Sequence, residues 1–386
     1  MRLFINSLAA SAGGGLTYIR NVLPHFAKKK DLLVTVALNP SLRREFHDLP
    51  EIEFLEIARP AARRFWREQS QLPSLIRERK CDVLLSSGNF ALRNSPVPQI
   101  LLSRNSIYCS HDYYSDLIAR HEYRMWLETR LAGFLASRSV RWADVTVAPS
   151  HAFAEDLHRW TGRPVRTIHH GFDCAEFFRD PTPLQPAVQD KLAGPAAALR
   201  LLFVSHYNYY RNFETLIRAL PLIRDSMKHR PVRLFLSCKL APGANPGAYN
   251  PQRAAALVKD LGVEDMVVEL GGIPYRQLHH LYRQCHMYVT PAYAETFAHP
   301  LVEAMACGLP VVASDIAVHR EICGDAALYF ERFSPAGLAQ CVMDVMGSDV
   351  QGERLSAAGK ERSQQFSWQV HVDQIFDLAQ SISFRS

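Results

Sequence analysis

The sequence MYVTPAYAETFAHPLVEAMACGLPVVAS, residues 287–314, predicts a strand, a loop, a helix and a second strand. Short apolar runs with β-branched residues stand at 287–290 and 310–313. Between them, Pro300 occupies the first turn of the helical pattern, where proline is well tolerated, and the pattern ends at Gly308. Two strands joined by a helix are typical of a parallel sheet. This stretch therefore predicts an α/β fold.

The alternation of apolar runs and helical patterns continues along the whole chain. The 386 residues, 48% of them hydrophobic, are enough for two cores. A Pro/Ala-rich stretch at 181–198 predicts a linker. We therefore expect two tandem Rossmann-like, doubly wound domains at 1–180 and 199–366, facing each other across a cleft at the carboxyl ends of their strands. Strands are expected at 3–5, 32–37, 82–86, 100–102 and 145–148, then at 199–204, 232–237, 266–270, 287–290, 310–313 and 327–330.

Composition excludes several other classes of protein. The eight cysteines form no C-x-x-C pair and most stand in apolar runs, so we expect reduced core residues in a cytoplasmic protein. The histidine pairs at 169–170 and 279–280 are adjacent in the sequence, a spacing that does not favour a metal site. No stretch approaches the ~18 apolar residues of a membrane-spanning helix. The first residues superficially resemble a secretion signal, but Asn6 and Ser7 interrupt the apolar run, and we expect a buried first strand there.

The net charge of +6 lies entirely in the first half of the chain, where 25 Lys and Arg face 19 Asp and Glu in residues 1–180. Aromatic and basic residues interleave at 63–67 and along 120–142. For 120–142 we expect a helix whose apolar residues are buried and whose arginines are solvated. Contact with an anionic membrane surface is the alternative. Nucleic acid is not expected as a partner, because no binding motif accompanies the charge.

Two glutamates border the helix predicted near residue 300. Glu295 precedes the helix and Glu303 lies about one turn inside it, so both carboxylates can contact one ligand, one at a ribose diol and the other at sugar hydroxyls. The unpaired backbone N–H groups of Thr296 to Leu301 offer a seat for a diphosphate at the positive end of the helix dipole. The alternative is two surface glutamates that the helix dipole favours at this position.

This segment resembles the E-x7-E signature of glycosyltransferase family 4, the retaining group 1 enzymes of GT-B architecture, and EAMACGLPVVAS is similar to the family consensus. The resemblance implies that Glu295 contacts the transferred sugar as a catalytic residue and that Glu303 binds the nucleotide ribose. It also implies donor contacts from the intervening loop and helix start. One departure is an alanine at 298 where the family commonly has glycine. These donor-binding residues are Thr296, Phe297, Ala298, His299 and Leu301.

Residues 203–217 resemble the family segment in which an arginine and a lysine clamp the diphosphate. Arg211 matches the lysine and is assigned a catalytic role, while His206 replaces the arginine. Arginine can hold phosphate oxygens bidentately, whereas histidine does so well only when protonated. The alternative, a strand end followed by a helix cap, accounts for the shape of the segment but not for its cation.

Other segments extend the resemblance over nearly the whole chain. Residues 11–19 resemble the glycine loop after the first strand, which implies donor contacts from Gly13, Gly14 and Gly15. Residues 166–173 resemble the element before the interdomain linker. Residues 366–368 resemble the start of a terminal helix that returns to the first domain, here 367–386.

The first domain departs from the family pattern on its catalytic side. Many members place a histidine after the strand found here at 98–106, where this sequence has Arg104 and Asn105. Asn105 is the closest match and is assigned a catalytic role. Arg104 and His111 are candidate contacts on the acceptor side, and the alternative for His111 is an exposed loop residue.

The resemblance implies transfer of a mannosyl or glucosyl unit, with retention, from a nucleotide diphosphate sugar to a saccharide or lipid-linked saccharide. It implies neither metal nor cofactor, because Arg211, the helix start and the glycine loop supply the charge stabilisation. The expected location is the cytoplasm, with the inner face of the membrane as a peripheral site. A non-catalytic sugar-nucleotide-binding protein and a GT-B nucleotide-sugar epimerase are the alternatives.

Overall fold

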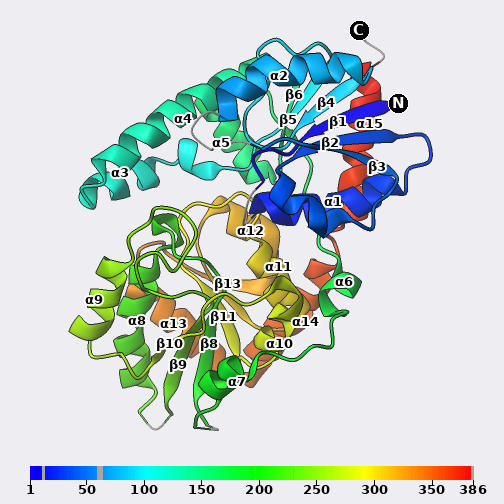
Figure 1. Ribbon diagram of the computed structural model, residues 1–386. Coiled ribbons are helices and arrows are strands. Elements are labelled where there is room, and N and C mark those ends of the chain that lie inside the picture. Colours follow the sequence, from blue (N-terminus) through cyan, green and yellow to red (C-terminus); the bar gives the residue numbers. More distant parts are fainter. Residues whose placement is uncertain (11–13, 59–63, 196, 229, 384–386) are drawn as a thin grey trace. The chain divides into compact units, whose positions relative to one another are not determined.

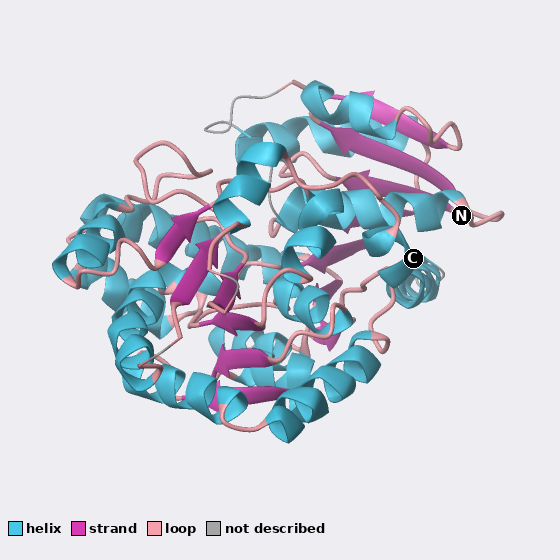
Figure 2. Cartoon of the chain, turned by 90° about the horizontal axis from the view of Figure 1, so that it is seen from below, coloured by secondary structure: helices cyan, strands magenta, loops and turns pink. Residues whose placement is uncertain are grey.

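The computed structural model describes residues 1–386 except 11–13, 59–63, 196, 229 and 384–386, and the chain divides into two compact units (Figure 1). Unit 1 comprises Met1–Gly171 and Ser367–Ser386, and unit 2 comprises Phe172–Phe366. Each unit contains one sheet with helices packed on both faces (Figure 2). The predicted α/β fold with two Rossmann-like domains is therefore confirmed. Residues 181–198 lie inside unit 2 and include a short helix.

Unit 1 is built on a seven-stranded sheet of order β3-β2-β1-β4-β5-β6-β7, and all its strand pairs are parallel. The strand β3 was not predicted from the sequence, and neither was the two-residue β7. The strands are β1 (Arg2–Asn6), β2 (Leu33–Leu38), β3 (Ile52–Glu56), β4 (Val83–Ser86), β5 (Gln99–Leu102), β6 (Val145–Ala148) and β7 (Arg166–Thr167). The α-helices are α1 (Gly14–Ala27), α2 (Arg64–Glu78), α3 (His111–Ala119), α4 (Tyr123–Trp142), α5 (His151–Thr161) and α15 (Trp368–Ser383).

Unit 2 has a six-stranded parallel sheet of order β10-β9-β8-β11-β12-β13. Its strands are β8 (Leu199–Phe203), β9 (Val232–Leu236), β10 (Val267–Glu269), β11 (Met287–Thr290), β12 (Val311–Ser314) and β13 (Ala327–Phe330). Its α-helices are α6 (Cys174–Phe178), α7 (Pro186–Leu192), α8 (Phe213–Ser226), α9 (Gln252–Asp260), α10 (Leu278–Tyr282), α11 (His299–Ala306), α12 (Ala317–Cys323), α13 (Pro335–Met346) and α14 (Asp349–Ser363).

Both sheets have a switch point where the chain turns from one side of the sheet to the other. In unit 1 it lies between β1 and β4, and in unit 2 between β8 and β11. In open α/β sheets, ligands bind beside such a point at the carboxyl ends of the strands. Ligand binding is therefore expected at the loops that follow β1, β8 and β11, which carry the three motifs noted in the sequence.

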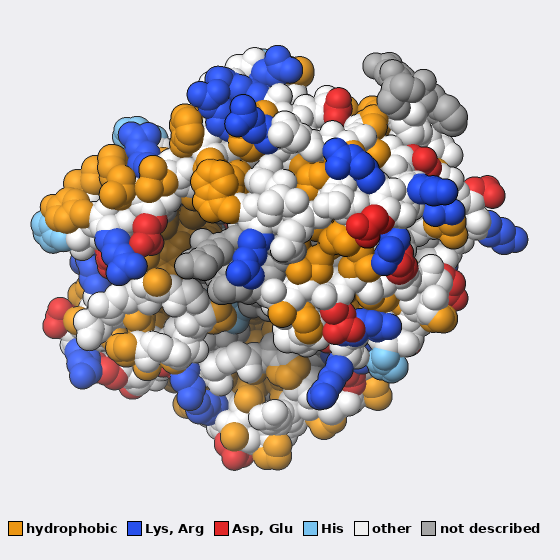
Figure 3. Space-filling model, turned by 45° about the horizontal axis from the view of Figure 1, so that its top comes forward, with side chains coloured by type: hydrophobic (Ala, Val, Ile, Leu, Met, Phe, Trp, Pro, Cys, Tyr) orange, Lys and Arg blue, Asp and Glu red, His pale blue; other side chains and the backbone are white. Residues whose placement is uncertain are grey.

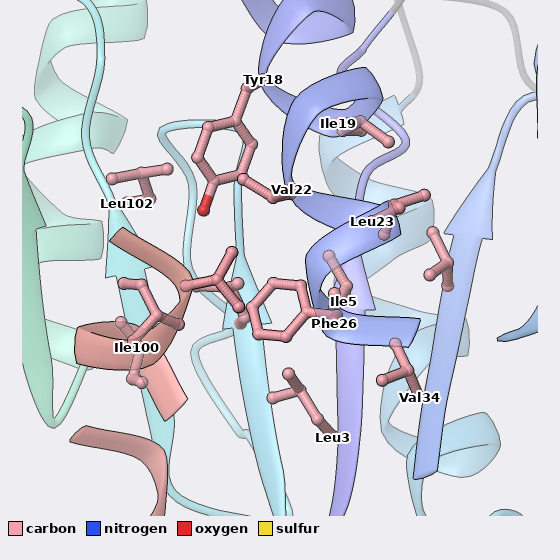
Figure 4. Packing of buried hydrophobic residues seen from close by; sticks show 14 of the residues in the cluster. Leu3, Ile5, Tyr18, Ile19, Val22, Leu23, Phe26, Val34, Ile100 and Leu102 are labelled. Atoms are coloured by element: carbon pink, nitrogen blue, oxygen red, sulfur yellow. The ribbon is translucent and has the colours of Figure 1, made fainter. Parts of the chain in front are cut away.

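The core of unit 1 forms where α1 packs on the sheet (Figure 4). The helix presents an apolar face at helical spacing, so its side chains reach β1, β2 and β5 together. The C-terminal helix α15 adds Trp368, Val372 and Ile375 to the same cluster. The side chains of α1 in this cluster include Tyr18, Ile19, Val22, Leu23 and Phe26.

The helix α15 begins against a glycine. A Cβ atom placed on Gly171 would lie 2.0 Å from the backbone nitrogen of Trp368 and 2.3 Å from its Cα. Behind this contact, the hydroxyl of Tyr18 and Nε2 of His371 are 3.1 Å apart, and Nδ1 of His371 is 2.8 Å from the carbonyl of His169. The segments 166–173 and 366–368, noted in the sequence, thus meet at Gly171 within unit 1.

The helix α4 departs from expectation. We expected its apolar residues to be buried, and this is wrong for Leu127, Leu131 and Phe134, which are 54%, 59% and 58% exposed. Met125 and Leu135 are part-buried, while Gly133 and Ala136 are buried. The helix therefore packs on unit 1 through small residues and leaves larger apolar side chains in solvent.

The cysteines are all free, and half of them are fully buried as expected. Cys81, Cys238, Cys285 and Cys323 lie in the core. Cys174, at the start of α6, is exposed, so the expectation of a core residue is wrong there. None of the helices in the described residues combines the length and hydropathy needed to span a bilayer.

Candidate active site

Two loops of unit 2 meet at the switch point of its sheet. The loop after β8 leads through a short 3-10 turn, Tyr209–Arg211, into α8, and the loop after β11 leads into α11. The backbone N–H of Tyr293 donates to the carbonyl of Tyr210 at 3.0 Å. The side-chain amide of Asn212 donates to the carbonyl of Pro291 at 3.1 Å. These bonds hold the two loops in fixed register.

An ion pair joins the same two loops. Arg211, from the first loop, donates through Nη1 to Oε1 of Glu295, from the second. The Arg211 side chain is 20% exposed and that of Glu295 only 9% exposed. The Nε of Arg211 is buried and has no hydrogen-bond partner among the described residues. The cation is thus anchored by one carboxylate and retains donor capacity for another acceptor.

The start of α11 explains why glycine suits position 298. Ala298 adopts φ 63° and ψ 60°, the left-handed region, where a side chain is disfavoured. Pro300 lies in the first turn, as predicted, and Leu301 donates its N–H to the carbonyl of Ala298 at 3.0 Å. Phe297 is buried against His299 and Phe366, whereas Thr296 is part-buried. Thr296 to Leu301 therefore surround one helix start. The prediction of unpaired N–H groups along this segment is wrong for Leu301, which donates to Ala298, for Thr296, whose N–H lies 3.4 Å from Oε2 of Glu295, and for Pro300, which has no N–H.

Glu303 is the fifth residue of α11 and is not on the surface. Only 4% of it is exposed, so the alternative of a surface glutamate is wrong for this residue. The hydroxyl of Tyr282 donates to Oε2 of Glu303 at 2.8 Å. Burial raises the pKa of Glu303 to about 7, and the bond from Tyr282 opposes that rise. Its charge therefore changes near neutral pH.

His206 lies on the loop after β8 and is exposed. Desolvation of its ring, and then the positive charge of Arg211, lower the pKa of His206 from its ordinary value. This shift favours the neutral imidazole. In that form His206 can offer a hydrogen bond at this site but not the positive charge of the arginine that the family motif has here.

In unit 1, Arg104 bonds to the first residue of α1, where the described part of the glycine segment begins. Gly13 lies outside the described residues, and Gly14 and Gly15 begin α1. Arg104 donates to the carbonyl of Gly14 at 2.7 Å and to that of Ser87 at 2.5 Å. Its guanidinium lies 4.8 Å from the ring centre of Tyr18, and desolvation lowers the pKa of Arg104 to about 10. Arg104 therefore ties the first residue of α1 to the residue that follows β4.

The two remaining candidates of unit 1 lie elsewhere on the chain that follows β5. Asn105 accepts from the N–H of Ile107 at 3.3 Å, so its side chain caps the 3-10 turn Ser106–Tyr108. His111 is exposed at the start of α3 and lines a cavity between α3 and α4. Within the part of the chain that the structure describes, no hydrogen bond joins either residue to Arg104 or to the start of α1.

Sequence reasoning missed two residues next to the site of unit 2. One is Tyr282, the partner of Glu303, which precedes that residue by a whole strand and loop. The other is His319, fully buried on α12, where burial lowers its pKa to about 4 and the charge of Arg211 adds to the shift. Nδ1 of His319 lies 2.9 Å from the carbonyl of Ser314. No local pattern marks either residue, because its role depends on tertiary contacts.

Two Rossmann-like units, with charged loops at the switch point of the second sheet, define a protein of GT-B architecture. Residues 187–362 match the family model of glycosyl transferases group 1, and residues 12–176 match that of glycosyltransferase family 4. The chain belongs to the group 1 glycosyltransferases of family 4. The predicted family is thereby confirmed.

The chain is also similar to individual members. It is 26% identical over 245 residues to a D-inositol 3-phosphate glycosyltransferase of Xylanimonas cellulosilytica, a match covering 61% of this chain and 56% of the relative. It is 32% identical over 106 residues to the O-antigen chain mannosyltransferase B of Escherichia coli, covering 28% of each. The chain thus spans about half, or less, of these relatives. The crystal structure of Anabaena HepE in complex with UDP-glucose superposes with a TM-score of 0.75 at 17% identity, covering 99% of this chain and 100% of HepE, which shows a shared fold.

Proposed function

We propose that this protein is a retaining glycosyltransferase that moves a hexosyl unit from a nucleotide diphosphate sugar to a saccharide, free or lipid-linked. The observation that carries the proposal is the Arg211–Glu295 pair, because it sets a cation and a carboxylate side by side at the switch point of unit 2. GDP-mannose and UDP-hexoses are the first donors to test. The mannosyltransferase relative and the UDP-glucose complex of HepE support this choice.

The chemistry follows from charge. As the bond between the sugar and the diphosphate breaks, negative charge grows on the departing oxygen. Arg211, with its unpartnered Nε, and the N–H groups at the start of α11 are suited to stabilise that charge. Glu295 then accepts hydrogen bonds from sugar hydroxyls, and Glu303 from the ribose. The acceptor hydroxyl attacks the same face of the sugar and passes its proton to the departing phosphate oxygen, which gives retention.

In this proposal the reaction needs no metal, because protein cations and helix N–H groups supply the charge stabilisation. Asn105 and His111 remain proposed contacts in unit 1, with Arg104 acting through the glycine loop. The protein would work in the cytoplasm, at or near the inner membrane face, and its free cysteines suit a reducing compartment.

The test is a panel of UDP, GDP and ADP sugars, with thermal stabilisation and donor hydrolysis as readouts, in the presence of a chelator. We expect one donor to stabilise the wild type and both Glu295→Ala and Glu303→Gln, the latter less. Slow hydrolysis should occur in the wild type and fall at least about 100-fold in Glu295→Ala and Arg211→Ala. The matched control is Glu264→Ala, at an exposed glutamate of the same unit.

Three outcomes would contradict the proposal. Wild-type rates in Arg211→Ala would remove the diphosphate assignment. Donor binding without turnover, even with saccharide and lipid-linked acceptors present, would indicate a binding protein. Release of an isomeric sugar nucleotide without any acceptor would indicate an epimerase.

A further inference from the structure

A cavity of about 350 Å³ opens within unit 1, between the 3-10 turn Ser106–Tyr108 and the helices α3, α4 and α5. Its wall is mostly aromatic, and no acidic residue is among the described residues that line it. The lining residues are Tyr108, Cys109, His111, Tyr114, Ser115, Ile118, Trp126, Arg130 and Trp160. An apolar wall without carboxylates suits a hydrocarbon group better than a sugar, which would need several polar partners.

One cation stands at this cavity. The guanidinium of Arg130 lies 4.8 Å from the ring centre of Tyr114 and 5.1 Å from that of Trp126. The Tyr114 ring is itself fixed, because its hydroxyl donates to the carbonyl of Tyr108 at 3.1 Å. Arg130 is exposed, so its charge is available to an anion at the mouth of the cavity. The cavity therefore combines an apolar interior with a positive rim.

The adjoining surface of α4 carries an apolar stripe. Tyr123, Leu127, Leu131 and Phe134 follow one another at helical spacing and are each more than half exposed. Ile118, on α3, is 50% exposed and also lines the cavity, so stripe and cavity are continuous. In Figure 3, hydrophobic side chains gather at the α3–α4 end of unit 1, with Lys and Arg beside them.

The charges on α4 favour an anionic partner. Arg124, Arg138 and Arg141 are exposed on the same helix as Arg130. The single acidic residue of α4, Glu128, lies 2.8 Å from Arg124 in an exposed ion pair. On α3, Asp116 is paired with Arg120 at 2.7 Å. Two copies of this face would bring arginine against arginine, which disfavours self-association.

We propose that the α3–α4 face binds an anionic lipid bilayer. The apolar stripe enters the boundary between head groups and acyl chains, and the arginines of α4 contact the lipid phosphates. The cavity takes part of one lipid chain, with Arg130 at its head group. This places unit 1 where an acceptor carried on a lipid would be presented, but the binding itself requires neither donor nor transfer.

The first test is flotation of the full chain with vesicles of phosphatidylcholine, with and without 30% phosphatidylglycerol as a chosen composition of about one third anionic lipid. We expect binding only to the anionic vesicles, weakened by salt, and at least about tenfold weaker in Leu127→Glu/Leu131→Glu. The control is Leu222→Glu, at an apolar residue of unit 2 that is 42% exposed. Thermal unfolding checks that each variant folds.

Equal binding by the double variant and the wild type, or no binding to anionic vesicles, would overturn the proposal. So would a wild-type dimer that the double variant converts to monomer, which would make the face a contact between two copies. Because no nucleotide sugar is present, failure here leaves the transferase proposal unaffected, and failure of that proposal leaves this one intact.

The second test concerns the cavity. Phosphatidylglycerol brominated on its acyl chains quenches the fluorescence of nearby tryptophans. We expect the fraction of tryptophan fluorescence that is quenched to be at least halved in Trp126→Phe/Trp160→Phe, because these two tryptophans line the cavity. Arg130→Gln should weaken binding to anionic vesicles more than Arg253→Gln, at an exposed arginine of unit 2. Undiminished fractional quenching in the double variant would show that no chain enters the cavity.

Discussion

Each unit holds an arginine beside its switch point, and the two arginines are used differently. Arg104, in unit 1, donates to two backbone carbonyls and lies against the ring of Tyr18. Arg211, in unit 2, pairs with the carboxylate of Glu295, which can itself form other bonds. The buried Nε of each arginine has no hydrogen-bond partner among the described residues, so the two differ in the partners of their other nitrogens. The carbonyls that hold Arg104 belong to the backbone of unit 1, so these bonds support the fold. Arg211 is in a position to exchange partners when a ligand arrives.

The difference shows that position along a motif does not fix what a residue does. From sequence, Arg104 was a candidate for acceptor contact and Arg211 for diphosphate contact, and both assignments rested on a place after a strand. Their hydrogen-bond partners separate them. An arginine whose donors go to carbonyls of its own unit supports structure, whereas one paired with a carboxylate is suited to chemistry.

The largest expected effect comes from the packing that encloses Arg104. Trp368 packs on Tyr18, with ring centres 5.8 Å apart, and Gly171 allows the backbone of Trp368 to approach. In Gly171→Ala the new methyl would overlap backbone atoms, which no side-chain rotation relieves. We expect the free energy of unfolding to fall by about 3 kcal/mol or more, measured by denaturant titration. Gly272→Ala, where a Cβ meets nothing within 4 Å, is the control, and equal midpoints for the two variants would refute the contact.

His371, which packs beside Tyr18 and Trp368, should make the free energy of unfolding depend on pH. Burial lowers the pKa of His371 to about 4, below the ~6.5 of an unfolded histidine. The folded state therefore disfavours protonation of His371. The stability that comes from neutral His371 is fully present above pH 6.5 and is lost as the pH falls from about 6.5 to 4. The loss amounts to about 3 kcal/mol.

His371→Gln removes this dependence while keeping a donor and an acceptor. The measurement is the difference in the free energy of unfolding between wild type and His371→Gln at pH 7 and at pH 4. We expect the difference to shrink by about 3 kcal/mol on acidification. His47→Gln, at an exposed histidine, should give a constant difference. A constant difference for His371→Gln as well would mean that His371 is not held neutral.

Arg104 and Arg211 should differ in how much their replacement costs in stability and in turnover. Arg104→Met leaves the carbonyls of Gly14 and Ser87 without this donor, so we expect a loss of about 1–3 kcal/mol in the free energy of unfolding, together with lower turnover. Replacing both members of the other pair, in Arg211→Met/Glu295→Gln, removes two opposite charges at once. We expect that variant to lose less than about 1 kcal/mol and nearly all turnover. If Arg104→Met and Arg211→Met/Glu295→Gln lost similar amounts of stability, the assignment of Arg104 to structure and of Arg211 to catalysis would be wrong.

Much of this molecule could be predicted from its sequence. Apolar runs, such as 201–203 in β8 and 311–313 in β12, mark strands that are buried on both faces, and every predicted strand is present. The strand β3 was missed because Glu53 and Glu56 interrupt its apolar residues, which suits an edge strand that is only partly buried. The helix start at residues 298–300 was located because proline and the glycine-to-alanine departure are local signals.

The sequence predicted which loops carry the candidate site, but not how their charged residues pair or how their pKa values shift. Sequence placed Arg211 and Glu295 on different loops, 84 positions apart, and only the register of β8 beside β11 brings them together. The shifted pKa of Glu303 depends on burial and on Tyr282, neither of which a motif records. The exposure of Leu127 and Leu131 was also missed, because an amphipathic pattern does not say which side of a helix faces the protein.

The smallest expected effect on stability comes from Ala298, at the start of α11 in unit 2. Its left-handed backbone costs an alanine ~1–2 kcal/mol relative to glycine. Glycine also loosens the unfolded chain, which offsets ~0.4–1 kcal/mol of that gain. We therefore expect Ala298→Gly to raise the free energy of unfolding by between zero and about 1.6 kcal/mol, seen as a small rise in Tm. If Ala298→Gly instead lowered the Tm by several degrees, the helix start of unit 2 would not have the left-handed geometry on which its N–H groups depend.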